Sequence, residues 1–158
     1  MRRELVSKWM SREVVTVSPQ TTIAEVDRLM TDHRIRRLVV VEKERVVGII
    51  TRGDVRSVKP IPAVRLTEME IKRRLSQLKV NEVMTLDPVT IAPEATIDEA
   101  AWVMLESKFS GLPVVDDKRQ LIGIITESDI FRLVVREWGK DTGRYIEWIK
   151  DETRMSHA

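Results

Sequence analysis

Residues 48–54, Gly-Ile-Ile-Thr-Arg-Gly-Asp, return as residues 123–129, Gly-Ile-Ile-Thr-Glu-Ser-Asp. The likeness extends outward from this motif. The segment 6–54 aligns with 80–129, at an offset of 74 residues as far as Val41 and of 75 after one additional residue in the second copy. Similar composition alone does not put so many identical residues in register. The sequence therefore predicts a duplicated supersecondary unit.

The length of the chain bounds the fold. With 158 residues there is room for one compact domain, whereas a unit of about fifty residues would be marginal alone. We therefore expect the two copies to share a core. Since the sequence has no cysteine, it predicts neither disulfides nor a thiolate zinc site. The absence of an apolar leader and of a membrane-length apolar run favours a cytoplasmic protein.

Charge divides the chain into two unlike halves. The whole sequence has 27 basic and 25 acidic residues, a net charge of +2, which gives little reason to expect nucleic-acid binding despite a pI of 9.0. Residues 1–79 carry 18 Lys and Arg against 10 Asp and Glu, a net +8, and residues 80–158 carry 9 against 15, a net −6. The halves either attract each other within one chain or pair head to tail between two chains.

Each copy follows a β-α-β-β-α pattern. An extended stretch, 14–17 or 88–91, is stopped by a proline, and a helix then begins at a Thr-x-x-Glu capping box, at Thr22 or Thr96. Two apolar runs joined by a charged turn predict a hairpin, and the closing Thr-x-x-Asp begins a second helix. Because the runs are apolar almost throughout, we expect both faces of each sheet to be covered, one by the repeat's own helices and the other by the partner repeat. The hairpin runs are 38–41 with 46–50, and 112–115 with 121–125.

The remaining segments complete the predicted organisation. The closing helix of the second copy is predicted over 127–138, whereas that of the first stops near Lys59, since Pro60-Ile61-Pro62 cannot continue a helix. A linker helix is predicted from Thr67, and a last amphipathic helix from 142 to about 153. The predicted parts are a first repeat (1–58), a linker with a helix (59–79), a second repeat (80–138) and a C-terminal helical extension (139–158).

Together these features resemble the cystathionine β-synthase (CBS) domain in a tandem pair, often called a Bateman module. The resemblance covers roughly residues 6 to 138. It depends on the opening strand 14–19, the Leu-Pro-Val-Val strand 112–115 and the terminal Gly-Ile-Ile-Thr-x-x-Asp recurring in register. It implies an α/β (α+β) fold in which two repeats pack about a pseudo-twofold axis. It also implies two clefts between the repeats for adenosine-containing ligands such as AMP, ADP, ATP, S-adenosylmethionine or NAD.

The closing motif contains the residue types that such a ligand needs. A carboxylate can accept two hydrogen bonds from a ribose cis-diol, a role that suits Asp54 and Asp129. A hydroxyl at the start of a helix favours an anion, which makes Thr51 and Thr126 candidates for binding phosphate. The alternative interpretation is that all four residues are only helix caps.

By the resemblance, each cleft pairs the closing motif of one repeat with a wall from the other. Arg36 is at a position where some family members bind phosphate, and its counterpart in the second repeat, Ser110, is neutral. Arg52 lies in the first closing motif at the position that Glu127 occupies in the second. Since charge-assisted contacts are stronger than neutral ones, we expect the first cleft to prefer phosphorylated adenosine. The residues implied for the first cleft are Arg36, Thr51, Arg52, Asp54, Pro88, Val89, Phe109, Gly111 and Pro113. Those implied for the second are Val14, Val15, Ile35, Arg37, Val39, Ser110, Thr126 and Asp129, with Val39 in place of the family's usual proline.

Trp102 is predicted to point away from the buried side of its helix. It is therefore either a lone surface aromatic or part of an interface, and we favour an interface. CBS pairs commonly form disc-shaped dimers through their helices, so the resemblance implies a homodimer. The charge division favours an antiparallel arrangement of its two chains.

The sequence contains no pattern that predicts catalysis, such as a His-acid constellation, a phosphate-binding glycine loop or metal-ligand spacing. We therefore expect a regulatory or sensory module rather than an enzyme, with an adenine nucleotide as regulatory ligand and no required cofactor or metal. Such a module would pass a change in the tilt of its repeats to a protein partner. The alternative is an interaction or oligomerisation module with vestigial clefts. Neither nucleic-acid nor membrane partners are expected.

Overall fold

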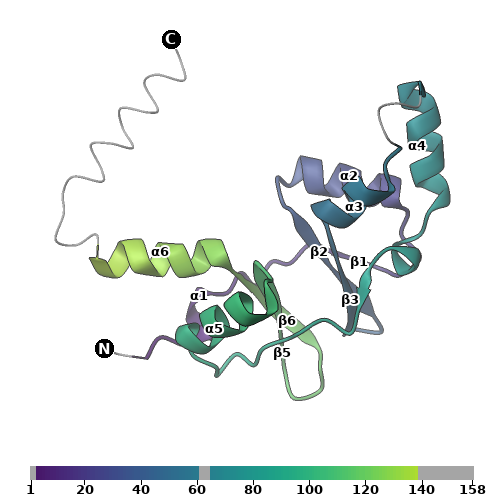
Figure 1. Ribbon diagram of the computed structural model, residues 1–158. Helices are drawn as coiled ribbons and strands as arrows, with labels where there is room; N and C mark the ends of the chain where they lie inside the picture. The colour runs from purple at the N-terminus through teal and green to yellow at the C-terminus, as the bar shows by residue number, and fades with distance from the viewer. Residues whose placement is uncertain (1–2, 61–64, 139–158) are drawn as a thin grey trace, which may run out of the picture.

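The computed structural model describes residues 3–60 and 65–138, which form two α+β repeats side by side (Figure 1). The predicted C-terminal helix, 142 to about 153, lies outside the described residues. The first repeat contains β1 (Thr16–Val17), α2 (Ile23–Asp32), β2 (Arg37–Glu42), β3 (Arg45–Thr51) and α3 (Arg52–Val58). The second contains α5 (Ile97–Ser107), β5 (Gly111–Val115), β6 (Leu121–Thr126) and α6 (Glu127–Trp138). The segments that precede the repeats contain α1 (Val6–Trp9), α4 (Glu68–Gln77), a 3₁₀ turn (Val80–Glu82) and β4 (Thr85–Leu86).

The two sheets follow one plan. In the first repeat the strand order is β1-β2-β3-β4, with β1 parallel to β2 and the other neighbours antiparallel. In the second repeat β5 and β6 pair antiparallel, and single bridges from Ile91 to Val114 and from Ser11 to Ile124 take the places of β1 and β4. The opening strands are therefore shorter than the predicted 14–17 and 88–91. Proline at position 88 has no amide hydrogen to donate to a ladder.

Each repeat incorporates the segment that precedes the other one. We call residues 4–11 and 78–85 the lead-in segments. Val80 and Met84 pack in the core of the first repeat, whereas Val6 and Met10 pack in the core of the second. In the linear sequence each repeat starts with its own lead-in segment. In the packed structure the two lead-in segments are exchanged, so each packs in the core of the other repeat.

Matching hydrogen bonds hold both exchanged segments. The amide of Ile23 donates to the carbonyl of Leu78 at 3.0 Å, and the amide of Ile97 donates to the carbonyl of Glu4 at 2.9 Å. These donors occupy equivalent positions in the two helices α2 and α5. The contacts are thus repeated reciprocally, as expected for two units related by a pseudo-twofold axis.

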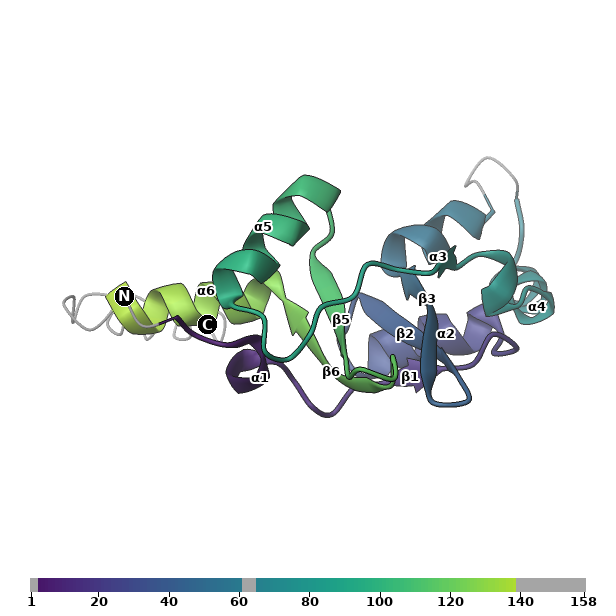
Figure 2. The same ribbon diagram turned by 90° about the horizontal axis from the view of Figure 1, so that it is seen from below.

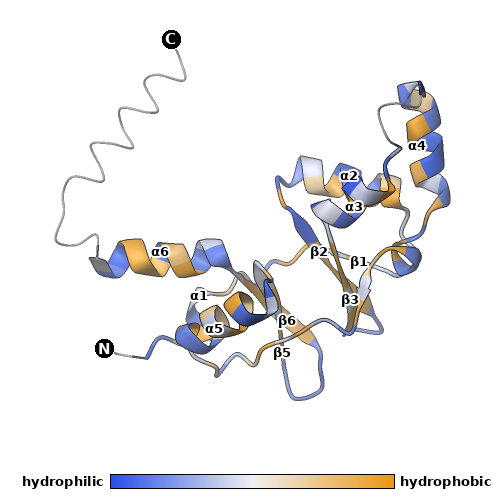
Figure 3. Ribbon diagram, in the orientation of Figure 1, coloured by the Kyte–Doolittle hydropathy of each residue, from blue (hydrophilic) through white to orange (hydrophobic). Residues whose placement is uncertain are grey.

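The two hairpins lie next to each other in the middle of the molecule, and the helices lie on the outer sides (Figure 2). Val39, Val46 and Val115 are buried where the hairpins meet. Figure 3 shows hydrophobic residues along both hairpins. This arrangement confirms that each sheet is covered on one face by helices and on the other by the partner repeat.

Most of the predicted helix boundaries are confirmed by their caps. Complete capping boxes form at Thr51, Thr67 and Thr96. At Thr22 the hydroxyl accepts from the amide of Glu25, but the carboxylate of Glu25 pairs with Arg28 at 3.2 Å instead of returning to the cap. Within the described part of the chain, no helix is both long and apolar enough to cross a bilayer.

Candidate functional site: two clefts between the repeats

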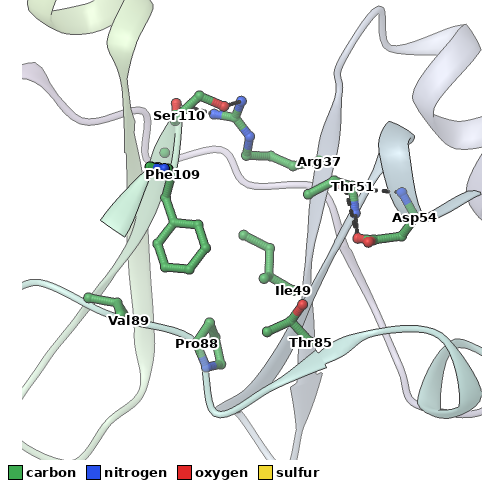
Figure 4. Close-up of a pocket in the computed structure, with 11 residues that line it drawn as sticks. Arg37, Ile49, Thr51, Asp54, Thr85, Pro88, Val89, Phe109 and Ser110 are labelled. Carbon is green, nitrogen blue, oxygen red and sulfur yellow. Dashed lines mark hydrogen bonds between the residues drawn. The ribbon is translucent and has the colours of Figure 1, made fainter. Parts of the chain in front are cut away.

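The first cleft lies between β3 and β4 on one side and the residues that lead into β5 on the other (Figure 4). Its volume is about 260 Å³. Figure 4 shows Pro88, Val89 and Phe109 opposite Ile49, which gives the cleft an apolar wall suited to a flat ring. The lining residues are Arg37, Ile49, Thr51, Asp54, Thr85, Pro88, Val89, Lys108, Phe109, Ser110 and Gly111.

The second cleft has a volume of about 360 Å³ and lies between the start of the first repeat and the N-terminus of α6. Its walls are more strongly charged than those of the first cleft. Because both arginines and carboxylates line it, it is suited to a polar ligand. The lining residues are Ser11, Glu13, Val14, Val15, Arg34, Ile35, Arg36, Arg37, Ser110, Ile124, Thr126, Glu127, Ser128, Asp129 and Arg132.

The structure brings together most of the residues that the sequence implied for each cleft. Thr51, Asp54, Pro88, Val89, Phe109 and Gly111 meet at the first, and Val14, Val15, Ile35, Arg37, Ser110, Thr126 and Asp129 meet at the second. Three of the implied residues line neither cleft, namely Val39, Pro113 and Arg52. Val39 is fully buried between the hairpins, and Pro113 is buried within β5.

Two arginines are placed differently from the prediction. Arg36 lines the second cleft instead of the first. Arg52 lines neither, because its guanidinium donates to the carbonyls of Met30 and Ile35, at 3.1 and 3.3 Å, and so ties α3 to the end of α2. The charges that suggested a phosphate preference for the first cleft are therefore absent from it, and that expectation loses its basis.

In the first cleft only one of the two carboxylate oxygens of Asp54 takes part in the helix cap. One oxygen, Oδ2, accepts from the amide and from the hydroxyl of Thr51, each at 2.7 Å. The hydroxyl of Thr51 in turn accepts from the amide of Asp54 at 3.2 Å, so its proton and one lone pair are used by the cap. Among the described residues, Oδ1 of Asp54 has no hydrogen-bond partner and is free for a ribose hydroxyl.

In the second cleft the same cap is present but the second carboxylate oxygen is occupied. Oδ2 of Asp129 accepts from the amide and hydroxyl of Thr126 at 2.9 and 2.8 Å. Oδ1 accepts from Arg132 at 2.8 Å. The side chain of Arg132 is 70% exposed and that of Asp129 only 4%, so the guanidinium can leave while the carboxylate stays. A ribose hydroxyl in this cleft would compete with Arg132 for Oδ1 of Asp129.

Arg37 spans the gap between the two repeats. Its Nη1 donates to the carbonyl of Ser110 and its Nη2 to the hydroxyl of the same residue, as Figure 4 shows. The pKa of Arg37 is lowered, chiefly by burial, and the carboxylate of Glu127 offsets only part of this shift. An arginine keeps its charge in spite of such a shift, so a fixed positive charge lies between the clefts.

Several lining residues were not among those assigned to the clefts from the sequence. Lys108 and Arg34 occupy equivalent positions in the repeat, both with positive φ, at 56° and 53°. One lines the first cleft and the other the second, so the repeat register alone could have identified Lys108. Thr85, by contrast, reaches the first cleft only because its lead-in segment is exchanged. In residues 3–60 and 65–138, no group of three His, Cys, Asp or Glu is arranged to hold a metal ion.

Comparisons with known proteins agree with this architecture. The CBS domain profile matches residues 6–60 and 80–136. An inosine-5′-monophosphate dehydrogenase of Korarchaeum cryptofilum is 38% identical over 120 residues, covering 76% of this chain and 22% of that protein. A CBS domain-containing protein of Dictyostelium discoideum is 33% identical over 133 residues, covering 84% of this chain and 92% of that protein. The solved CBS domain pair of protein MJ0100, in complex with 5′-methylthioadenosine and S-adenosyl-L-methionine, has a TM-score of 0.70 and 28% identity, covering 85% of this chain and 98% of that one.

The chain therefore consists of two α+β repeats that share an interface, with one cleft on each side of that interface. This architecture defines a tandem repeat pair. The chain belongs to the CBS domain family, in the paired arrangement called a Bateman module. It spans about a fifth of the length of the dehydrogenase, 22%, and nearly all of the Dictyostelium protein, 92%.

Proposed function

We propose that the chain is a regulatory module that binds an adenosine-containing ligand in the clefts between its repeats. The observation that carries this proposal is the free Oδ1 of Asp54, whose other carboxylate oxygen, Oδ2, is held by the Thr51 cap in a cleft with an apolar wall formed by Pro88, Val89 and Phe109. A carboxylate can hold a ribose hydroxyl while an apolar wall takes the base. The MJ0100 pair, with its two adenosine-containing ligands, supports the same ligand class.

Thermal unfolding in the presence of ligands tests the proposal. AMP, ATP, S-adenosylmethionine, 5′-methylthioadenosine and NAD are each added at millimolar concentration, with GMP as the control for the base. A ligand at 100 times its Kd adds about 2.7 kcal/mol to the free energy of unfolding, which is a clear rise in Tm. If none of the five raises Tm, the ligand-binding proposal is wrong.

The role of Asp54 is tested by Asp54→Asn, which keeps the shape of the side chain and removes its charge. Hydrogen bonds to a charged group contribute about 1.5–3 kcal/mol, so we expect affinity to fall at least about tenfold. Asp117→Asn removes an exposed charge from a turn that lines neither cleft and is the matched control. Equal affinities for the two variants would contradict a ribose contact by Asp54.

A second function, in protein association, is favoured by an exposed apolar surface on the second repeat. We call it the α5–α6 patch; it consists of Trp102, Leu105, Phe131 and Val135, which are 60–77% exposed. Residues three or four apart share a face of a helix, so Trp102 and Leu105 form one exposed apolar pair on α5 and Phe131 and Val135 another on α6, and the two helices are in contact. Exposed apolar groups of this kind are typical of interfaces. We propose that the patch forms a homodimer contact, as the position of Trp102 in the sequence suggested.

Cross-linking distinguishes the two dimer arrangements. The charge division favours an antiparallel disc, in which α5 would meet the first repeat of the other chain. The equivalent helix α2 exposes the charged residues Glu25, Arg28 and Asp32, whereas the patch is apolar. A chain with the single cysteine Trp102→Cys cross-links to itself if like repeats meet and fails to do so in an antiparallel disc. A monomeric mass in solution would exclude both arrangements.

A further inference from the structure

Arg37 and Ser110 are the two residues that line both clefts. Arg37 begins β2 of the first repeat, and Ser110 lies immediately before β5 of the second. Their paired hydrogen bonds connect the repeats and at the same time form the partition between the clefts. The guanidinium is therefore within reach of a ligand on either side.

The fold has room for only one such arginine. In the repeat register Arg37 is equivalent to Gly111. A Cβ on Gly111 would lie 2.2 Å from Nη1 of Arg37 and 3.2 Å from its Cζ. Because the guanidinium fills the space where a side chain of the second repeat would be, the two clefts share a single cation at this place.

Two of the five N–H donors of Arg37 are used when the clefts hold no ligand. Nη1 and Nη2 both bond to Ser110, and burial removes water from the guanidinium. A phosphate offers stronger, charge-assisted bonds than a neutral carbonyl or hydroxyl. An anionic ligand in one cleft can therefore draw the guanidinium toward itself and away from the other cleft.

We infer that Arg37 couples the two clefts, so that an anionic ligand in one weakens the binding of a second anionic ligand in the other. The inference rests on the proposed binding of adenosine-type ligands. Two causes act in the same direction, because a guanidinium drawn toward one anion lies farther from the other and two anions on either side of it repel each other. Adenosine, which has no phosphate, has neither effect and binds the two clefts independently.

The experiment measures each cleft alone and then both together by calorimetric titration with AMP. Thr85→Trp blocks the first cleft and Ser128→Trp blocks the second, since each residue is exposed and lines only one cleft. In the unblocked chain we expect the second AMP to bind at least about 5-fold more weakly than the weaker of the isolated clefts, the lower end of typical coupling. With adenosine the two stepwise constants should equal those of the isolated clefts.

Two arginine variants separate coupling from simple charge. Arg37→Gln should remove most of the AMP coupling, leaving only the weak direct repulsion between phosphates. Arg36→Gln is the matched control, because Arg36 is the next residue, is exposed and lines only the second cleft. It should weaken AMP binding there and leave the coupling unchanged. If Arg37→Gln unfolds the chain, Gly111→Ala serves in its place, since its Cβ displaces the guanidinium and keeps the charge.

The outcomes distinguish this inference from the proposed function. The role of Arg37 is overturned if AMP and adenosine both bind with the same ratio of stepwise constants. It is also overturned if the coupling survives in Arg37→Gln and Gly111→Ala. Either result leaves the ligand-binding function intact. Absence of binding of both AMP and adenosine overturns the coupling, and the proposed function fails with it only when none of the five ligands of the thermal test raises Tm.

Discussion

Gly48 and Gly123 allow the exchanged lead-in segments to approach the hairpins. A Cβ on Gly48 would lie 2.5 Å from the sulfur of Met84 and 3.1 Å from the carbonyl oxygen of Thr85. At Gly123 the corresponding distances are 2.6 Å to the sulfur of Met10 and 3.0 Å to the carbonyl oxygen of Ser11. The glycine of the repeated motif is thus explained by packing, because neither glycine has a positive φ.

Gly48→Ala is expected to destabilise the protein by about 1–3 kcal/mol, the usual cost of an overpacked core. Gly53→Ala is the control, because the Cβ there would meet only the hydroxyl oxygen of Thr51 at 3.5 Å, and alanine is the better helix former. Urea denaturation measures both. A Gly48→Ala variant as stable as Gly53→Ala would show that the lead-in can move away without cost.

Arg132 limits access to Asp129 in the second cleft. Its removal frees the carboxylate oxygen for a ribose hydroxyl, so Arg132→Ala should bind adenosine more tightly there, by about 1 kcal/mol or roughly 5-fold. Adenosine is used because Arg132 would also attract a phosphate. Arg136→Ala removes a charge from the same helix outside the cleft and should leave the affinity unchanged. Titration with the first cleft blocked by Thr85→Trp measures the effect.

At the scale of elements, helix α4 depends on its capping box. Hydrogen bonds from the amide and hydroxyl of Thr67 hold the pKa of Glu70 below its usual value. A lowered carboxyl pKa means that the stabilisation is complete above the usual pKa of Glu and is lost as pH falls through the lowered value. We expect the first turn of α4 to fray in that acidic range. Hydrogen-exchange protection factors, which correct for the intrinsic pH dependence of the exchange rate, should fall at the start of α4 in the wild type, and protection factors that do not change with pH would contradict it.

Elements that depend on contacts between residues close in the sequence were predicted more accurately than those that depend on distant residues. The caps at Thr51, Thr67 and Thr96 are formed within four residues, so the sequence alone located these helix starts. The opening strands depend on partners far along the chain, and they proved shorter than predicted. Local patterns therefore predicted the helices better than the sheet edges.

The placement of the arginines shows a second limit of the sequence. Successive side chains in an extended segment point to opposite sides, so an error of one position moves a residue to the other side of a wall. Arg36 was assigned to the first cleft, but it lines the second, whereas Arg37 reaches both. Asp54 and Asp129 each line a cleft, where the family resemblance implied them. The contact of Arg37 with Ser110 joins residues of different repeats, so no local sequence pattern predicts it.

At the scale of the whole molecule, the exchanged lead-ins make each repeat depend on the other. Val80 belongs in sequence to the second repeat, but it is fully buried in the core of the first. Val80→Ala removes two methyl groups and should cost about 2 kcal/mol, including the cavity term. We expect the loss of hydrogen-exchange protection to be greatest in α2 and β2. Protection lost mainly in α5 and β5 would contradict the exchange, and Val6→Ala should give that opposite result.

The exchange also has a consequence for how such a chain can arise and be made. A polypeptide with one repeat and its own lead-in could not fill its core and would need a second molecule to donate the missing piece. Joining two copies in one gene replaces that encounter with a tethered one at high effective concentration, so folding no longer depends on how much protein is present. During synthesis, the first repeat can finish its core only after the ribosome has released the beginning of the second.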